Sequence, residues 1–346
     1  MSTAPRSPRV TLKDIAREAG ISHGAVSLAL RNSPEVSKET CQRVQRIAGE
    51  MGYQPNPLAA GLAQFKRDSK SAPIQAALAW FNFWPDPKAL RSYSEFDHIW
   101  LGAVEAAEKY GYRLEEFCCQ HLMPVSRLEE IMLARGINGI LVPPGRIPPE
   151  MAGFHWEKFT VVRLSRTENE LDFHTVMSHQ SANAILAFDK VREKGYRRIG
   201  FVGRPFRPRR FGAGYHWAQS LAPEMPALPV LFMEEGKTSE NQAALEVWLK
   251  KWKPDAIITE CAELATMLEK AGVQVPEDIG VAALNVLDMP FDAGIYPNPE
   301  EIGRVGILAA MSFMYDQAKG IPPIQREVLI KGNWVEGKSL SGVEGT

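Results

Sequence analysis

Near its start the chain carries two short helical patterns joined by a glycine, in the segment VTLKDIAREAGISHGAVSLALRN. In the first pattern Ile15, Ala16 and Ala19 fall at helical spacing, so they form one apolar stripe. Gly20 supplies a turn that a residue with a Cβ forms poorly, and the Ser22 hydroxyl is placed to cap the second helix. Two helices joined in this way are typical of a helix-turn-helix, which enters a groove of DNA.

The second helical pattern has an inner and an outer side. Val26 and Leu30 lie four residues apart on the inner side. The outer side is spaced i, i+3, i+4 and i+7, and with the residue that starts the helix it is expected to face the major groove: His23, Gly24, Ser27, Leu28 and Arg31. Thr11 is expected to cap the first helix through its hydroxyl.

A third helix is predicted from Ser37 to about Met51, ended by Gly52. Its pattern turns Val44, Ile47 and Met51 inward and Arg43 and Arg46 outward. Three helices in about 50 residues are enough to close a small core. The sequence therefore predicts an all-helical domain over residues 1–55.

Residues 56–72 form the second informative segment. Asn56 and Pro57 are a favoured helix start, but the apolar run to Gln64 is only two turns long and contains Gly61. Such a helix is not stable alone, so it is expected to form only when a partner packs on it, such as its twin from a second subunit together with DNA. The alternative interpretation is an ordinary polar linker.

The distribution of charge separates the two ends of the chain. Residues 1–70 hold 11 lysines and arginines against 6 acidic residues, a net charge of +5. The whole chain has a net charge of −1, so the remainder is acidic. A local basic region favours a local nucleic-acid contact, although a solvated basic face is the plainer alternative.

From Pro73 onward short apolar runs alternate with amphipathic segments. The runs occupy residues 76–83, 112–117, 138–143, 159–164, 174–178, 198–203, 228–233, 255–259 and 279–284. Helical patterns occupy residues 97–110, 125–135, 181–194, 242–252, 264–271 and 299–319. Strand and helix repeated this often predict an α/β fold with parallel sheets and helices on both faces.

Several classes of function find no support in the sequence. No apolar run approaches a membrane span and the N-terminus lacks the apolar centre of a signal peptide, so a cytoplasmic protein is expected. GISHG at residues 20–24 matches a hydrolase nucleophile elbow, but a helical pattern precedes Ser22 where that motif requires a strand. No strand is followed by a nucleotide-binding glycine motif, and no cofactor is expected.

The sequence offers few candidate residues for a metal or catalytic site. Cys118, Cys119 and His121 could be soft metal ligands, but no fourth partner is in view, and buried thiols are the favoured interpretation. His174 with His179 and Glu260 with Cys261 are the nearest catalytic pairs, and neither has a placed partner. We therefore expect no metal, no catalytic residue and no enzymatic activity.

Residues 10–64 resemble the lac-repressor family of bacterial transcription regulators. The shared words are V-T-L-x-D-I-A at 10–16, A-G-I-S at 19–22, V-S at 26–27, S-P-E-V-S at 33–37, G-Y-x-P-N at 52–56 and L-A at 62–63. The resemblance implies that the helix after Gly20 reads the major groove and that residues 56–72 hold a hinge helix whose Leu62 wedges into the minor groove.

The resemblance also implies which residues contact DNA. They are Thr11, Ser22, His23, Gly24, Ala25, Ser27, Leu28, Arg31, Asn56, Leu62 and Ala63. This chain departs from the commoner pattern, because Gly24 has no side chain and Leu28 replaces a frequent arginine. Specificity is then expected to rest more on His23, Arg31, apolar contacts with thymine methyls and DNA deformability.

Residues 73–340 resemble the effector-binding core of the same regulators, which is similar to periplasmic sugar-binding proteins. The matching segments are 193–203, 253–259, 271–284 and 302–309. The resemblance implies two lobes crossed three times by the chain, near residues 177, 297 and 322. The first lobe is expected to hold residues 73–177 and 298–321, and the second residues 178–297 and 322–340.

A small-molecule site is expected in the cleft, outside the carboxyl ends of the strands. Its candidate residues are Asn82, Trp84, Arg163, Arg210, Glu260 and Asn285. Trp84 offers a stacking face for a sugar ring, with core packing as an equal alternative. If the arginines face the cleft, they favour an anionic ligand such as a sugar acid, while solvated arginines are the alternative.

Together these features predict a homodimeric transcriptional regulator, acting as a repressor, that binds a pseudo-palindromic DNA operator. Its affinity for DNA is expected to change when a small molecule, a sugar or a sugar acid, closes the two lobes. No heptad repeat follows Trp334, so no tetramerising tail is expected. The alternative is a transport-type solute-binding protein, which would share the two-lobed core.

Overall fold

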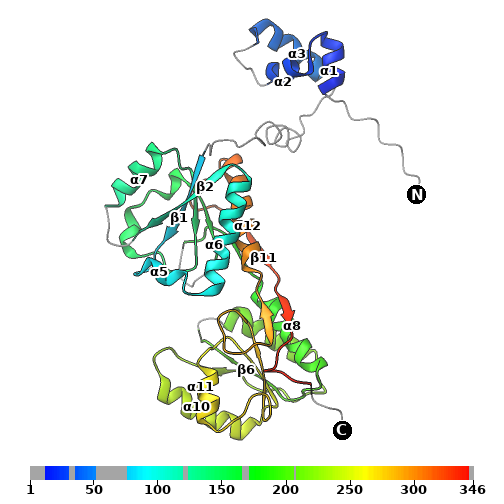
Figure 1. The fold of residues 1–346 in the computed structure, drawn as a ribbon. Coiled ribbons are helices and arrows are strands. Elements are labelled where there is room, and N and C mark those ends of the chain that lie inside the picture. The colour runs from blue at the N-terminus through cyan, green and yellow to red at the C-terminus, as the bar shows by residue number, and fades with distance from the viewer. Residues whose placement is uncertain are drawn as a thin grey trace, which may run out of the picture. The chain divides into compact units, whose positions relative to one another are not determined.

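The computed structural model describes residues 12–30, 36–51, 76–119, 124–165, 171–205 and 208–342 (Figure 1). Two compact units make up the chain, Met1–Ala72 and Pro73–Thr346, called here the head and the core. Within the described residues no helix combines the length and the apolar character needed to span a membrane.

The described residues of the head form the helices α1 (Leu12–Ala19), α2 (His23–Ala29) and α3 (Lys38–Glu50). Gly20 between α1 and α2 has a φ of +63°, a conformation that strains residues with a Cβ, so glycine is required in this turn. Ser22 caps α2 by accepting a hydrogen bond from the Ala25 amide at 3.2 Å, and Ser37 caps α3 in the same way. The predicted turn and the Ser22 cap are confirmed.

A small apolar core joins α1, α2 and α3. Its buried members are Ile15, Ala19, Val26, Ala29, Cys41, Val44 and Ala48. Leu30 and Ile47, predicted to point inward, are half-buried at its edge. Arg43 and Arg46 are exposed on α3, as predicted.

The first lobe of the core is built on a six-stranded parallel sheet with the order β11-β5-β4-β3-β1-β2. Its strands are β1 (Ala76–Asn82), β2 (Tyr112–Cys118), β3 (Gly139–Val142), β4 (Thr160–Arg163), β5 (His174–Ser178) and β11 (Glu327–Ile330). Its helices are α5 (Pro87–Leu90), α6 (Ser94–Lys109), α7 (Val125–Ala134) and α12 (Pro299–Tyr315), with the short turns η1 (Pro149–Gly153) and η2 (Trp156–Lys158). Helices α6 and α12 pack side by side (Figure 1).

The second lobe is built on another six-stranded sheet, with the order β12-β10-β9-β8-β6-β7. Its strands are β6 (Ile199–Gly203), β7 (Leu231–Phe232), β8 (Ala256–Thr259), β9 (Gly280–Ala283), β10 (Gly294–Tyr296) and β12 (Asn333–Val335). Its helices are α8 (Gln180–Glu193), η3 (Pro208–Gly212), α9 (Ala213–Ser220), α10 (Thr238–Trp252) and α11 (Leu264–Lys270). Only β12, among these strands, runs antiparallel to its neighbour.

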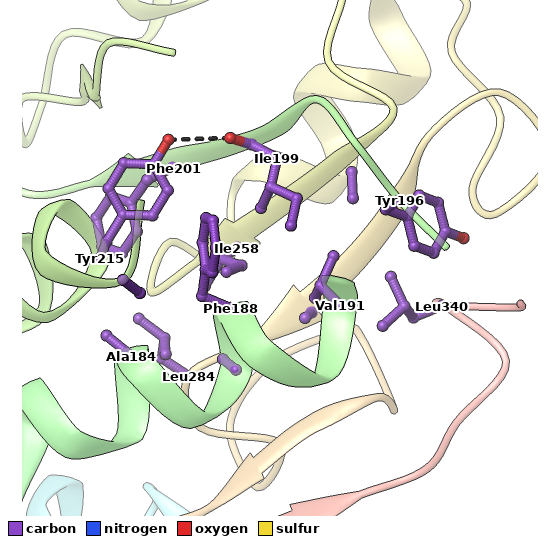
Figure 2. Packing of buried hydrophobic residues seen from close by; sticks show 14 of the residues in the cluster. Ala184, Phe188, Val191, Tyr196, Ile199, Phe201, Tyr215, Ile258, Leu284 and Leu340 are labelled. Atoms are coloured by element: carbon purple, nitrogen blue, oxygen red, sulfur yellow. Dashed lines mark hydrogen bonds between the residues drawn. The ribbon is translucent and has the colours of Figure 1, made fainter. Parts of the chain in front are cut away.

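Figure 2 shows how α8 packs on the second sheet. Ala184, Phe188 and Val191 on α8 meet the buried side chains of the strands, and Tyr215 lies beside Phe201 with ring centroids 5.2 Å apart. The buried Tyr215 hydroxyl donates to the Ile199 carbonyl oxygen at 2.9 Å, so its polar atom is satisfied inside the core.

The chain crosses three times between the two lobes. The first crossing lies between β5 and α8, and the second between β10 and α12, close to the expected residues 177 and 297. The third differs from the expectation of residue 322, because β11 still pairs with β5 through Ile330 and the crossing follows it. The resemblance to the family did not indicate β11, which is a short edge strand whose only ladder in the described structure is to β5.

The α/β fold with parallel sheets is confirmed, and every predicted strand lies within one or two residues of an observed one, except β7, which is much shorter. Sequence patterns missed β10, β11 and β12, which have three or four residues each, and the helices α5 and α9. The three strands and α5 contain too few residues to establish a period, whereas this reason does not apply to α9, which has eight residues.

Candidate DNA interface and effector site

The outer face of α2 is the candidate DNA interface of the head. Val26 and Ala29 are fully buried, so the opposite side of this helix is the one left to solvent. Gly24 is exposed and Leu28 is half-buried on that side. A Cβ added at Gly24 would meet no atom closer than Ser22 Oγ at 3.9 Å, so this position is open space on the surface of the head.

The structure places some of the predicted DNA-contacting residues and not others. Ser22, Gly24, Ala25 and Leu28 lie at the start and on the surface of α2, and His23 and Ser27 belong to the same helix. Thr11, Arg31, Asn56, Leu62 and Ala63 lie outside the described residues, as does the predicted hinge helix. Their roles stay predictions.

Asn82, at the carboxyl end of β1, is fully buried. Its amide nitrogen donates to the Pro87 carbonyl at 2.9 Å and to Glu116 Oε1 at 3.0 Å, and its Oδ1 accepts from the Trp84 amide at 3.0 Å. Both the amide nitrogen and the amide oxygen of this buried side chain are thereby hydrogen-bonded within the protein. Asn82 therefore shapes the loop after β1 and is not carried into the proposed effector site.

Trp84 is half-buried in an aromatic group of the same lobe. Its indole nitrogen donates to the Pro144 carbonyl at 2.7 Å, and its ring lies 5.6 Å from Tyr93 and 6.1 Å from Phe96 between centroids. Trp84 therefore packs within the lobe, and part of its surface remains exposed, while its role as a stacking face for a sugar ring stays a prediction.

The two arginines of the candidate site differ in exposure. Arg163 ends β4 and is 2% exposed, and one of its guanidinium nitrogens donates to the Gly145 carbonyl at 3.1 Å. Arg210 is half-buried, and its guanidinium lies 3.6 Å from Met177 Sδ. Its carbonyl accepts from Ser181 Oγ at 2.7 Å, which places it next to the first crossing. Neither arginine is the freely solvated side chain of the plainer alternative.

Glu260 and Asn285 both follow strands of the second sheet. Glu260 comes after β8 and accepts a hydrogen bond from the Arg204 amide at 3.0 Å. Asn285 comes after β9, and its amide nitrogen donates to Glu95 Oε2 at 3.0 Å. Glu95 belongs to α6 of the first lobe, so the Asn285 side chain contacts both lobes.

Sequence patterns missed the carboxylate that completes this contact. Asp288 accepts hydrogen bonds from the backbone amides of Ser94 at 2.6 Å and Glu95 at 3.0 Å. These amides begin α6, and Tyr93, at the N-cap position, has no capping side-chain bond. The sequence held no signal for this contact, because the helix was predicted to begin at residue 97 and nothing local points to a partner 194 residues away.

The thiols and His174 are structural. Burial raises the pKa of the Cys118 and Cys119 thiols, and it raises that of Cys261 to about 12, so all three stay protonated and weakly reactive at neutral pH. His174 is buried against Phe313, with ring centroids 4.1 Å apart. Within the described residues no cluster of three potential metal ligands occurs, and His121 lies outside them.

A hollow of about 840 Å³ lies at the amino ends of the strands of the first sheet, opposite the ends that carry the candidate effector residues. Its lining includes Ala76, Tyr112, Gly136 and Thr160, which begin or precede strands, and Met311 from α12. Ligands of open parallel sheets bind outside the carboxyl ends of the strands. We therefore do not assign the effector to this hollow.

Comparison with known proteins gives matches over both units. Residues 11–56 match "Bacterial regulatory proteins, lacI family", and residues 188–340 match "Periplasmic binding protein-like domain". The chain is 23% identical to the HTH-type transcriptional repressor CytR of Escherichia coli, over 96% of this chain and 98% of that protein. It is 25% identical to the HTH-type transcriptional regulator PtxS of Pseudomonas putida, over 97% and 98%.

Two solved structures are similar in fold along nearly the whole chain. The transcriptional regulator CelR in complex with cellobiose has a TM-score of 0.56 at 20% identity, covering 96% of this chain and 100% of that one. The lac repressor dimer bound to operator and the anti-inducer ONPF has a TM-score of 0.54 at 16% identity, with the same coverage. At these identities the likeness supports the two-lobed fold and the helical head.

Proposed function

We propose that this chain, whose residues 11–56 match the lacI family of bacterial regulatory proteins and whose residues 188–340 match a periplasmic binding protein-like domain, is a cytoplasmic transcriptional repressor controlled by a small-molecule effector. The observation that carries the proposal is the head: α2 is capped by Ser22, held by Val26 and Ala29, and presents its other side to solvent. This is the arrangement in which a recognition helix enters a major groove. The relatives described above are regulators by name, which argues against an enzyme.

In the proposed complex, contacts from α2 to the bases are mostly apolar. Gly24 would leave room for close approach of the helix to DNA, and the partly exposed Leu28 would meet a thymine methyl group. Hydrogen bonds from His23 and Arg31 would supply part of the base recognition, and insertion of Leu62 into the minor groove would bend the operator. Sequence-dependent deformability of the operator then carries much of the specificity.

We propose that the functional unit is a homodimer that reads the two halves of a pseudo-palindrome. Support comes from α9, where Trp217 and the C-cap residue Leu221 are four residues apart and each is 60% exposed. Two large apolar side chains on one exposed helix face favour a protein interface over solvent. A second copy of the chain is the partner we assign to this face.

The effector is proposed to bind between the lobes, close to Trp84, Arg163, Arg210, Glu260 and Asn285. Trp84 offers a partly exposed aromatic face, and the arginines offer groups that hold carboxylates or phosphates. A sugar or an anionic sugar derivative fits this combination. The cellobiose complex of the structurally similar CelR is in keeping with a sugar ligand.

Selection of bound sequences from a random DNA pool tests the proposal. We expect a pseudo-palindrome to emerge, bound saturably and more tightly than a single half-site in an electrophoretic shift assay. The logarithm of the affinity should fall by about 0.9 per neutralised phosphate for each log unit of salt. Recovery of no preferred sequence at low salt would reject the proposal and favour a solute-binding protein.

A pair of variants separates groove reading from simple charge. Leu28→Asp places a carboxylate on the outer face of α2, so we expect at least a tenfold loss of affinity for the selected operator. Gln42→Asp makes the same change of charge at an exposed position of α3 and should keep the preference for that operator. Equal losses in the two variants would show that α2 does not read the groove.

A further inference from the structure

Helix α6 begins without a side-chain cap from the described residues of its own lobe. The residue at its N-cap position, Tyr93, makes no side-chain hydrogen bond to the first turn. The first-turn amides of Ser94 and Glu95 instead donate to the two carboxylate oxygens of Asp288, at 2.6 Å and 3.0 Å. A carboxylate at this position also interacts favourably with the positive end of the helix dipole. The start of α6 is therefore completed by the other lobe.

Asn285 makes a second tie in the same place. Its amide nitrogen donates to Glu95 Oε2 at 3.0 Å and lies 3.3 Å from Asp288 Oδ2. One amide group thus approaches two carboxylates that would otherwise repel each other. The bond joins the second lobe to the side chain of Glu95 as well as to its backbone.

The loop that carries Asn285 and Asp288 is itself fixed. Asn285 Oδ1 accepts from the Leu287 amide at 3.0 Å, and the Val286 amide donates to the Ile295 carbonyl at 2.9 Å. The loop is thereby anchored to β10 of its own sheet. Because of these two hydrogen bonds, Asp288 is expected to move together with the second lobe.

The first-lobe side of the contact is equally well anchored. Helix α6 packs along α12, and their backbones approach so closely at Gly102 and Gly303 that neither position has space for a Cβ. Since α12 starts directly after the second crossing, the contact and the crossings act on the same packed pair of helices.

We propose that Asp288, Asn285 and Glu95 form a clasp that holds the two lobes of the core together before any effector binds. The chain already joins the two lobes at its three crossings. The clasp joins them a fourth time, through hydrogen bonds, and the lobes can separate when these bonds break. An effector that fits the clasped arrangement binds without first having to bring the lobes together, which favours selection of an existing state.

Pulsed dipolar EPR on the full-length chain tests the clasp. Nitroxide labels are attached to Ser126→Cys on α7 and Thr266→Cys on α11, which are exposed positions in different lobes. Chains with only one introduced cysteine measure the background from the native thiols. The unliganded protein is expected to give one narrow distance population.

The decisive variant is Asp288→Ala. Loss of a helix cap typically shifts a local equilibrium by about fivefold, so we expect the ratio of separated to clasped lobes to rise by at least this factor. Asp86→Ala is the matched control, because Asp86 caps α5 by accepting from the Lys88 amide at 3.0 Å within one lobe. It should leave the distance distribution unchanged.

Hydrogen exchange of the peptide that contains Ser94–Asp97 supplies the second measurement. If Asp288→Ala speeds exchange there while the EPR distances stay as in the parent, Asp288 is a local cap and the clasp is refuted. If Asp288→Ala folds poorly, Asn285→Ala is used in its place, since it removes the bond to Glu95 and keeps the cap. An unchanged distance distribution in that folded variant would equally overturn the proposal.

Discussion

The close packing of α6 against α12 gives the sharpest prediction of stability. An ideal Cβ on Gly102 would lie 2.1 Å from the Glu300 carbonyl oxygen, and one on Gly303 would lie 2.0 Å from the Ile99 carbonyl oxygen. Both obstructing atoms belong to the backbone, so no side-chain rotation relieves the overlap. Alanine at Gly102 therefore forces the two helices apart.

The magnitude follows from the size of the displacement. A carbon and an oxygen atom in ordinary contact are about 3.4 Å apart, so the helix backbones must separate by more than about 1 Å, and well-packed groups nearby lose contacts. Overpacking of this kind costs about 1–3 kcal/mol or more, against a gain of at most about 1 kcal/mol in helix propensity. We expect Gly102→Ala to destabilise the core by about 2 kcal/mol.

Urea unfolding followed by tryptophan fluorescence measures this change in the core alone. All eight tryptophans lie at or beyond Trp80, so the head is silent. Gly49→Ala on α3 is the matched control, because no atom lies within 4 Å of its added Cβ. It should leave the core unchanged and stabilise the head by up to about 1 kcal/mol, measured by amide exchange. A core as stable in Gly102→Ala as in the parent would refute the packing argument.

Two further predictions concern pH and assembly. Burial, followed by the nearby Arg326 charge, lowers the pKa of His174, and its Nδ1 accepts from the Arg326 amide at 3.1 Å. The unfolded chain therefore binds a proton at this histidine more tightly than the folded chain does. The contribution of neutral His174 to the free energy of unfolding is fully present above the ordinary pKa of 6.5 and is lost as the pH falls below it. His174→Asn should flatten this slope in melts from pH 7.5 to 5.5, and an undiminished slope would assign it to other groups. Replacing both Trp217 and Leu221 by serine should shift sedimentation toward the monomer and weaken operator binding, whereas serine at Val247, 67% exposed on α10, should change neither. A dimer that survives the double replacement would place the interface elsewhere.

Local sequence patterns predicted the parts of the fold whose stabilising contacts lie close in the chain. The turn at Gly20, the cap at Ser22 and the inward Val26 depend on neighbours within one or two helical turns. The central strands were predicted because continuous apolar runs bounded by polar residues are typical of buried parallel sheets. These signals need no knowledge of the rest of the molecule.

Candidate residues of the effector site were harder to judge. Asn82 and Asn285 were proposed because each lies at or just after the carboxyl end of a strand, but a residue at such a position can bond within its own lobe or reach the other lobe. Asn82 bonds within its own lobe to Pro87 and Glu116, whereas Asn285 reaches the other lobe at Glu95. Which partner an amide finds depends on where distant segments lie.

The sequence by itself determined the helices α1, α2 and α3 of the head, the alternation of strands and helices and the basic character of the N-terminal end. Tertiary structure alone decided that β11 stays with the first sheet through Ile330 and that Asp288 completes a helix 194 residues earlier in the chain. The physical reason is the range of the interactions. Periodicity and capping act over a few residues, while the pairing of an edge strand and a contact between lobes exist only after the sheets have brought distant segments together.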